Sequence, residues 1–412
     1  MTGCGLAKAD EMRRQLENPK SLRVIEVFFR REAAAKGYSQ LVINRVWQIL
    51  EGFGSFGFCK AHGAAFALPT YQSAWLKTHY PTEFLAGIMT HDPGMYPRRL
   101  LLAEARRLGV ALFGIDVNRS TNEYRVDVVT DANGVVTKGI RLSFVDVQGI
   151  SGAETERIIA GQPYENLTDF FVRAKPSRRT FERLAVIGAF DDLVRATVPT
   201  ATRGDIVARA KELNALKKKP ELETKDSLFY NNGKDHVPMG NPEPTAAEKV
   251  AAELGLLGLD ITQHALEEFR PMLDELGVSF ASELSGLRNK TNVLVAGVRV
   301  ATQTPPMRSG KRVVFVSLDD GSGVSDATFF EDAQERCSHI LFNNKLLLVG
   351  GKIRRTGVRG ISIMAENAWD IRDLWRDWQA KQKLKAAEGG APDYGDASGE
   401  NGGLARQLEL SA

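Results

Sequence analysis

FGFCKAHGAAFALPTYQSAWLKTHYP, residues 56–81, is the stretch around which the rest of the chain is interpreted. No acidic residue occurs between Gly52 and Thr82, while lysines, histidines and aromatic residues recur throughout. This mixture suits a polyanion that carries rings, because cations meet phosphates and aromatic side chains stack on bases. An apolar helix whose few basic side chains extend into solvent has the same composition. The residues alone leave both interpretations open.

The stretch closely resembles the fingers region of bacterial DNA polymerase III alpha subunits, the family C replicative polymerases. In that family a phenylalanine, a lysine and a histidine precede an alanine-rich helix that ends in W-L-K-x-H-Y-P. The matching residues here are Phe58, Lys60, His62, Ala64, Ala65, Tyr71, Gln72, Trp75, Leu76, Lys77, His79, Tyr80 and Pro81. The resemblance continues in order from about residue 5 to about residue 370. It implies that Lys60 and His62 bind the incoming nucleotide.

Length, net charge, cysteine content and apolar runs limit the classes of protein to which the chain can belong. A chain of 412 residues is too long for one ordinary domain, and its net charge of +3 means that a nucleic-acid surface must come from local clustering. The three cysteines, Cys4, Cys59 and Cys337, are far apart and odd in number, which fits neither a disulfide framework nor a zinc site and predicts a reducing cytoplasm. No apolar run approaches the roughly 18 residues of a membrane span, so we expect no membrane partner.

The glycines of GFGSFG, residues 52–57, formally match the G-x-G-x-x-G fingerprint of dinucleotide-binding folds. That fingerprint follows a strand and opens a helix. Here it follows a helical pattern over residues 7–50, so a Rossmann site is not expected. The resemblance makes these glycines the bend before the fingers helix instead.

VQGISGAETERII, residues 147–159, has the spacing of a helix-hairpin-helix motif. Its predicted hairpin consists of Gly149, Ile150, Ser151 and Gly152. Glycine lets the backbone approach a phosphate, and free amides at the start of the next helix can hold the anion. A short loop before any helix can look the same, so the motif alone leaves a purely structural turn open.

Residues 177–193 look like the degenerate second hairpin copy that follows in the alpha subunits. Five basic residues cluster around it: Arg173, Lys175, Arg178, Arg179 and Arg183. A charge run is usually a solvated face, but this one is strongly one-signed and adjoins the first hairpin. With the first hairpin, Arg178 and Arg179 are therefore assigned to duplex DNA.

Residues 201–245 are polar and charged, which predicts a helix followed by an exposed linker. The alpha subunits attach to the sliding clamp through a Q-x-x-L-F-like peptide, and two segments approximate it. KDSLF, residues 225–229, keeps Leu228 and Phe229 but has Lys225 in place of glutamine, whereas QLELS, residues 407–411, lacks the aromatic residue. KDSLF is the favoured clamp site, because Leu228 and Phe229 would bury most apolar area.

Residues 288–375 predict an OB-fold of five strands, with a helix between the third and fourth. The first loop between strands carries Arg308, Lys311 and Arg312, which are assigned to single-stranded DNA. Three phenylalanines, Phe315, Phe329 and Phe330, are interpreted as core residues. In the helical segment before the barrel, His264 has no second ligand nearby and is interpreted as structural.

The predicted fold is a multidomain α+β chain: a helical fingers segment, a tandem helix-hairpin-helix module and a C-terminal OB-fold β-barrel. The expected divisions are 1–115 for the fingers, 116–200 for a β-hairpin and the tandem hairpins, 201–245 for a helix and linker, 246–287 for a helical connector, 288–375 for the OB-fold, and 376–412 for a disordered tail.

The resemblance implies a DNA- and nucleotide-binding part of a DNA-directed DNA polymerase. The family's metal-binding aspartates lie in a palm domain before the fingers, and no residue here is assigned as catalytic or metal-binding. Magnesium belongs to the complete enzyme, so this chain alone is expected to be inactive. Expected partners are duplex and single-stranded DNA, the sliding clamp and, if a palm is supplied, a deoxynucleoside triphosphate. The alternative is a non-catalytic DNA-binding accessory protein or an inactive fragment.

Overall fold

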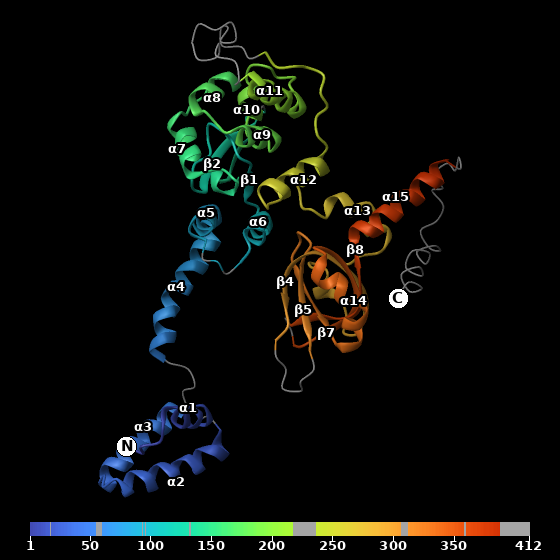
Figure 1. Ribbon diagram of the computed structural model, residues 1–412. Helices are drawn as coiled ribbons and strands as arrows, with labels where there is room; N and C mark the ends of the chain where they lie inside the picture. Colours follow the sequence, from blue (N-terminus) through green and yellow to red (C-terminus); the bar gives the residue numbers. More distant parts are fainter. Residues whose placement is uncertain are drawn as a thin grey trace. The chain divides into compact units, whose positions relative to one another are not determined.

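The structure is a computed structural model. It describes residues 1–16, 18–54, 60–92, 94, 96–131, 133–216, 236–305, 312–357 and 360–387 (Figure 1). The chain divides into two compact units, Met1–Tyr80 and Pro81–Ala412.

The first unit is helical. Its helices are α1 (Leu6–Gln15), α2 (Pro19–Ala35), α3 (Gln40–Gly54) and α4 (Lys60–His79). Asn18 caps α2 by accepting a hydrogen bond from the amide of Lys20 at 3.0 Å. Apolar residues at helical spacing then bury one face of α2 against α3, where the rings of Phe29 and Trp47 lie 5.7 Å apart. Helix α4 differs, because none of its described side chains is buried.

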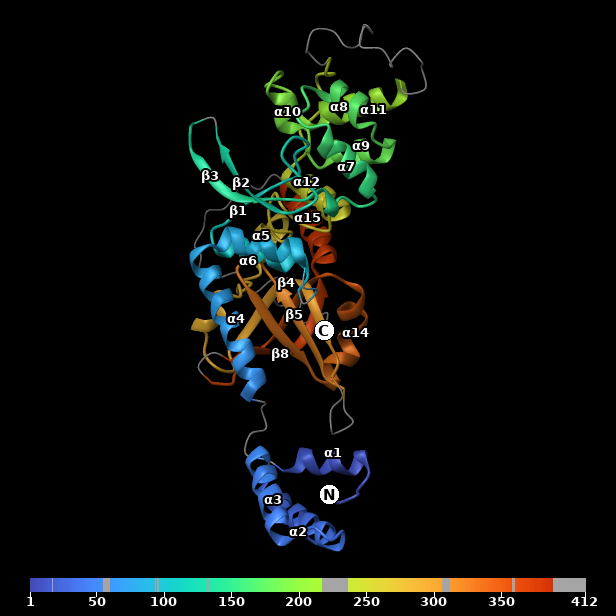
Figure 2. The same cartoon turned by 90° about the vertical axis from the view of Figure 1, so that its left-hand side faces the viewer.

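The second unit begins with helices around a small sheet. Its elements up to residue 216 are α5 (Pro81–His91), α6 (Arg98–Arg107), β1 (Ala111–Phe113), β2 (Arg125–Thr130), β3 (Val136–Arg141), η1 (Phe144–Asp146), α7 (Gly152–Ala160), α8 (Leu167–Ala174), α9 (Arg178–Val186), α10 (Asp191–Arg195) and α11 (Arg203–Leu216). Strands β2 and β3 form the antiparallel hairpin that alternation predicts, seen in Figure 2, and β1 pairs with β3 in parallel.

An aromatic cluster holds helices α8 to α10 together. The rings of Phe170 and Phe190 meet edge to face at 4.8 Å, and Phe181 lies 5.7 Å from Phe170. All three side chains are fully buried. Burial of large aromatic side chains dominates the energetics of such a core. It fixes the helices that carry the predicted DNA-binding hairpins.

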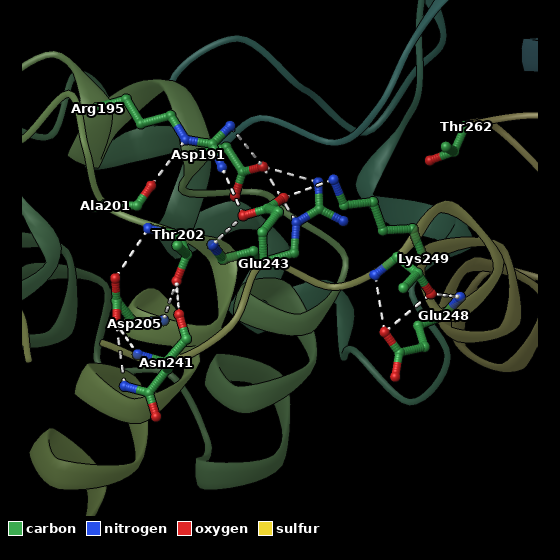
Figure 3. Close-up of polar contacts among 12 residues, drawn as sticks. Asp191, Arg195, Ala201, Thr202, Asp205, Asn241, Glu243, Glu248, Lys249 and Thr262 are labelled. Atoms are coloured by element: carbon green, nitrogen blue, oxygen red, sulfur yellow. Dashed lines mark hydrogen bonds and ion pairs between the residues drawn. The ribbon is translucent and has the colours of Figure 1, made fainter. Parts of the chain in front are cut away.

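Polar contacts attach the segment after residue 235 to these helices, as Figure 3 shows. Asp191 pairs with Arg203 at 2.8 Å, while Glu243 pairs with Arg195 at 3.2 Å and with Lys249 at 2.6 Å. The Glu243–Arg195 pair joins residues 241–249 to α10, the Glu243–Lys249 pair lies within that segment, and the Asp191–Arg203 pair joins α10 to α11. The segment leading into the connector is therefore fixed to the helix-hairpin-helix body.

The connector consists of short helices: α12 (Ala246–Leu256), η3 (Glu267–Phe269), α13 (Arg270–Glu275) and η4 (Leu284–Gly286). Its Asp260 side chain is fully buried and accepts two hydrogen bonds from Arg99 of α6, at 3.0 and 2.7 Å. The paired arginine is only 12% exposed. This buried pair ties the connector to the helices before it.

Asp260→Ala is expected to lower the free energy of unfolding by about 3–5 kcal/mol, because Arg99 would stay buried without its carboxylate. Asp274→Ala is the matched control. It removes an exposed pair in which Arg270 and Asp274 are 44% and 56% exposed, so a loss below about 1 kcal/mol is expected. Chemical denaturation measures both, and equal losses would contradict the account.

The connector also contacts the barrel through His264, which is buried. Its Nδ1 accepts a hydrogen bond from the amide of Leu266 at 3.3 Å, and its Nε2 lies 3.4 Å from a carboxylate oxygen of Asp319. These contacts agree with a structural histidine. Burial by itself would raise the pKa of Asp319, but the hydrogen bond with His264 holds that pKa below its ordinary value. The stability that Asp319 contributes is therefore present at neutral pH and lost as the pH falls below about 4.

The C-terminal part is a closed five-stranded barrel in the order β4-β5-β6-β8-β7. Its elements are β4 (Asn292–Gln303), β5 (Val314–Asp319), β6 (Val324–Phe329), α14 (Glu331–Asn343), β7 (Leu346–Arg355) and β8 (Ile361–Asp370). Helix α14 lies between the third and fourth strands, as predicted, and adds Cys337 and Leu341 to the barrel core. The expected OB-fold is confirmed.

Two details differ from the sequence predictions. Phe329 is fully buried, but Phe315 and Phe330 are 37% and 42% exposed, so their assignment to the core was wrong. Alternation explains Phe315, because neighbouring strand residues face opposite sides of the barrel wall.

The second difference is where the tail begins: helix α15 (Ile371–Ala387) includes residues 376–387, which the predicted divisions gave to the tail. Trp375 stacks on Trp378 at 4.8 Å and meets Phe269 at 5.5 Å. The indole of Trp378 also donates a hydrogen bond to Glu275 at 2.6 Å. This packing against the connector holds the helix; residues 388–412 lie outside the described part.

Candidate nucleic-acid interface

The predicted hairpin forms between η1 and α7, and it requires glycine at one position. Gly149 has a φ of +76°, in the left-handed region that L-residues avoid. A Cβ added there would lie 2.7 Å from Nη1 of Arg183, whose guanidinium donates a hydrogen bond to the carbonyl of Gln148. Gly152, in contrast, is the first residue of α7 and has open space around a Cβ. The two glycines, predicted to act alike, have different roles.

Helix α7 presents its first amides for an anion. Ser151 caps the helix in a capping box with Glu154, accepting from the Glu154 amide at 3.2 Å. Among the described residues, the amides of Gly152 and Ala153 have no acceptor. Free amides and the helix dipole favour negative charge at this end.

Glu154 joins the two hairpin copies. One of its carboxylate oxygens accepts the Ser177 amide at 2.7 Å, and Ser177 is the residue that caps α9. Burial by itself would raise the pKa of Glu154, but hydrogen bonds from the amides of Ser177 and Ser151 hold it below its ordinary value. The starts of α7 and α9 are thereby fixed side by side.

A basic cavity of about 530 Å³ lies at α9, next to the hairpin. Its lining residues are Arg178, Arg179, Glu182, Arg183, Val186 and Leu256. Arg178 is 80% exposed and pairs with Glu182 at 3.0 Å. Arg179 is exposed, and its guanidinium has no partner in the described part of the chain. Three arginines around one hollow suit phosphate groups, which guanidinium binds in a bidentate manner.

Not all the clustered basic residues are available. Arg173 pairs with Asp169, donates to the carbonyls of Gly161 and Pro163 at 2.6 and 2.7 Å, and packs on the ring of Tyr164. It serves the fold. Arg183, in contrast, belongs with Arg178 and Arg179, and sequence reasoning left it unassigned. Its spacing of four residues from Arg179 on one helix was the available signal.

The second hairpin, between α9 and α10, is covered by a side chain of the same chain. Gly188 has a φ of +83°, like Gly149. The guanidinium of Arg203 lies directly against it and pairs with Asp191 at 2.8 Å. Because Arg203 is only 12% exposed, this hairpin presents no comparable surface. The sequence predicted a degenerate second copy, and the covering of its hairpin by Arg203 agrees with that prediction.

The other predicted site residues are dispersed or outside the description. His62 lies on exposed α4, its ring 4.6 Å from that of Phe66, whereas the side chain of Lys60 is outside the described part. Arg312 is exposed just before β5. Residues Arg308, Lys311, Lys225, Leu228 and Phe229 lie outside the described residues.

Within the described residues, no group of three or more His, Cys, Asp and Glu side chains gathers to hold a metal ion. No helix in these residues is long and apolar enough to cross a membrane.

Family models match two parts of the chain. Residues 109–198 match a helix-hairpin-helix motif, and residues 293–371 match an OB-fold nucleic acid binding domain. The first range contains Gly149 and the arginine cavity except Leu256. The second coincides with the barrel.

Relatives cover most of the chain. An error-prone DNA polymerase of Symbiobacterium thermophilum is 31% identical over 86% of this chain and 36% of its own length. A DNA polymerase III subunit alpha of Vibrio cholerae is 27% identical over 90% of this chain and 32% of its own length. A structure of RecG bound to a three-way DNA junction is 16% identical over 46% of this chain and 26% of that chain, with a TM-score of 0.19 that carries no argument about fold.

The family resemblance is thus confirmed: the chain is a homologue of bacterial DNA polymerase III alpha subunits and error-prone DNA polymerases, and it spans about a third of the length of these relatives.

Proposed function

We propose that this chain is the DNA-binding part of a bacterial DNA polymerase and holds duplex DNA by its phosphates at the first hairpin. The observation that carries the proposal is the junction of Gly149, the free amides at the start of α7 and the three-arginine cavity. Backbone amides and arginines contact phosphate without reading bases, so binding is independent of sequence.

The proposal extends to the nucleotide and the single strand. Lys60 and His62 would contact the incoming deoxynucleoside triphosphate, once a palm domain with magnesium is supplied. Arg308, Lys311 and Arg312 would bind single-stranded template. Support comes from the relatives, which are named as DNA polymerases, and from the family match of the barrel to nucleic acid binding domains.

The sliding clamp is a proposed partner through Lys225, Leu228 and Phe229. A peptide docks on a partner mainly through its buried apolar residues, which Leu228 and Phe229 would supply. We place the chain in the cytoplasm, and its cysteines Cys4 and Cys337, both free, agree with a reducing compartment.

Gly149→Ala tests the proposed phosphate site at the first hairpin. The substitution is expected to weaken duplex binding about tenfold, because its Cβ would displace Arg183 and its φ of +76° strains an L-residue. Gly87→Ala on α5 is the matched control, because Gly87 has open space around a Cβ, has no positive φ and does not line the arginine cavity, so affinity is expected to stay within about twofold. Fluorescence anisotropy of a labelled duplex measures both.

Thermal unfolding of the two variants separates a local change at the hairpin from general loss of structure. A Gly149→Ala protein that melts like Gly87→Ala and binds duplex DNA equally well would contradict the proposed phosphate site. Retained single-strand affinity in Gly149→Ala would show that the barrel remains intact.

A further inference from the structure

A hollow on the outer wall of the barrel belongs to no site described above. It has a volume of about 410 Å³ and is lined by residues of β4, β7 and β8 together with Gly277 and Ser279 of the connector. OB-folds usually bind their ligands on the second and third strands, which here are β5 and β6. The hollow lies on the first, fourth and fifth strands instead, so it is separate from that surface.

A glycine in the middle strand creates the hollow. Gly350 of β7 pairs with Leu294 of β4 on one side and Asn367 of β8 on the other. A Cβ at Gly350 would lie 3.3 Å from both Leu294 and the six-membered ring of Trp369. Since Gly350 has no side chain, the side chains of the flanking strands form walls over an apolar floor.

Polar groups surround that floor. Asn292 and Asn367 both line the hollow, and in the described part of the chain neither side-chain amide has a hydrogen-bond partner. Lys352 pairs with Glu366 at the rim, where the two side chains are 48% and 51% exposed. Arg354 is exposed two residues along β7, on the same side of the strand as Lys352.

We propose that this hollow binds one nucleotide of single-stranded DNA, an inference that rests on the DNA-binding function above. The base lies against Leu294 and Trp369, Asn367 bonds its polar edge, and the phosphate lies at Lys352. The volume falls within the range of about 300–1,000 Å³ that is usual for small-ligand pockets. An asparagine amide pairs in a bidentate manner with the edge of adenine, so adenine is the favoured base.

Asn367→Leu tests the site, because leucine abolishes the amide and fills part of the hollow. Affinity of the full chain for a short labelled oligodeoxyadenylate is expected to fall about tenfold. Affinity for duplex DNA, bound at the hairpin, is expected to stay unchanged and thereby shows that the variant folds. Asn343→Leu is the matched control, because Asn343 is exposed at the end of α14 and does not line the hollow.

If leucine at 367 disturbs the barrel, a second variant, Lys352→Ala, removes the proposed phosphate contact and is also expected to lower single-strand affinity. Loss of single-strand affinity in either folded variant, with Asn343→Leu unaffected, supports the site. Unchanged single-strand affinity in a folded Asn367→Leu protein overturns the site and leaves the duplex-binding function standing. A wild-type chain that binds neither DNA overturns both proposals.

Discussion

Supplied with primed template, four deoxynucleoside triphosphates and magnesium, the purified chain is expected to add no nucleotide to the primer. Polymerisation needs carboxylates that hold two metal ions at the primer end. In the family that the chain resembles these aspartates lie in a palm domain before the fingers, and no residue of this chain is assigned to that role. We therefore expect extension at the background level, a loss of many orders of magnitude relative to a complete enzyme.

The measurement is primer extension on a gel, with a complete family polymerase as the positive control on the same template. Magnesium-dependent extension that follows the 412-residue chain through size-exclusion chromatography would contradict the expectation. Such a result would place catalytic carboxylates in this chain and would require a different assignment of its segments.

Reversing the charge of two arginines is expected to have the largest effect on duplex binding. Arg178→Glu with Arg179→Glu places two carboxylates where the cavity would meet phosphates. Affinity at moderate salt is expected to fall about a hundredfold, since each lost phosphate contact is replaced by repulsion.

The matched control is Arg13→Glu with Arg14→Glu on α1, which changes the net charge equally. These arginines are also adjacent and highly exposed, at 69% and 73%. Their reversal is expected to leave duplex affinity within about threefold at moderate salt, where long-range charge is screened. Equal losses in the two double variants would show that overall charge, and not the cavity, governs binding.

The sequence predicted the elements that depend on local pattern. The alternation of β2 and β3, the helical periods of α2 and α3, and the five strand segments of the barrel all follow from side-chain period. The hairpin before α7 follows from the spacing of Gly149, Ile150 and Gly152 in residues 147–159. Each signal is confined to a few neighbouring residues.

Features that depend on distant contacts were not predictable in this way. Arg173 and Arg178 look alike in the sequence, yet Arg173 is held by the carbonyls of Gly161 and Pro163. Likewise, Gly149 and Gly152 differ because only Gly149 lies against Arg183, a contact made across 34 residues. Backbone conformation and side-chain partners decide these roles, and neither can be deduced from the residue type alone.

The position of helix α15 also depends on contacts between residues that are far apart in the sequence. Its later residues are mostly polar and charged, and the predicted tail began at residue 376. The two indoles of Trp375 and Trp378 stack and pack on the connector, which lies about a hundred residues earlier in the chain. Residues 376–387 are rich in alanine, lysine and glutamine, which favour a helix, and tertiary packing of the two indoles fixes this helix on the connector.

The salt dependence of duplex binding tests the central claim most directly. Wild-type affinity is expected to fall linearly as the logarithm of salt concentration rises, because phosphate neutralisation releases counterions. The Arg178→Glu, Arg179→Glu protein is expected to show a slope shallower by about two, one for each lost contact. A wild-type affinity that does not change with salt, or identical slopes in the two proteins, would contradict phosphate binding at the hairpin and its arginine cavity.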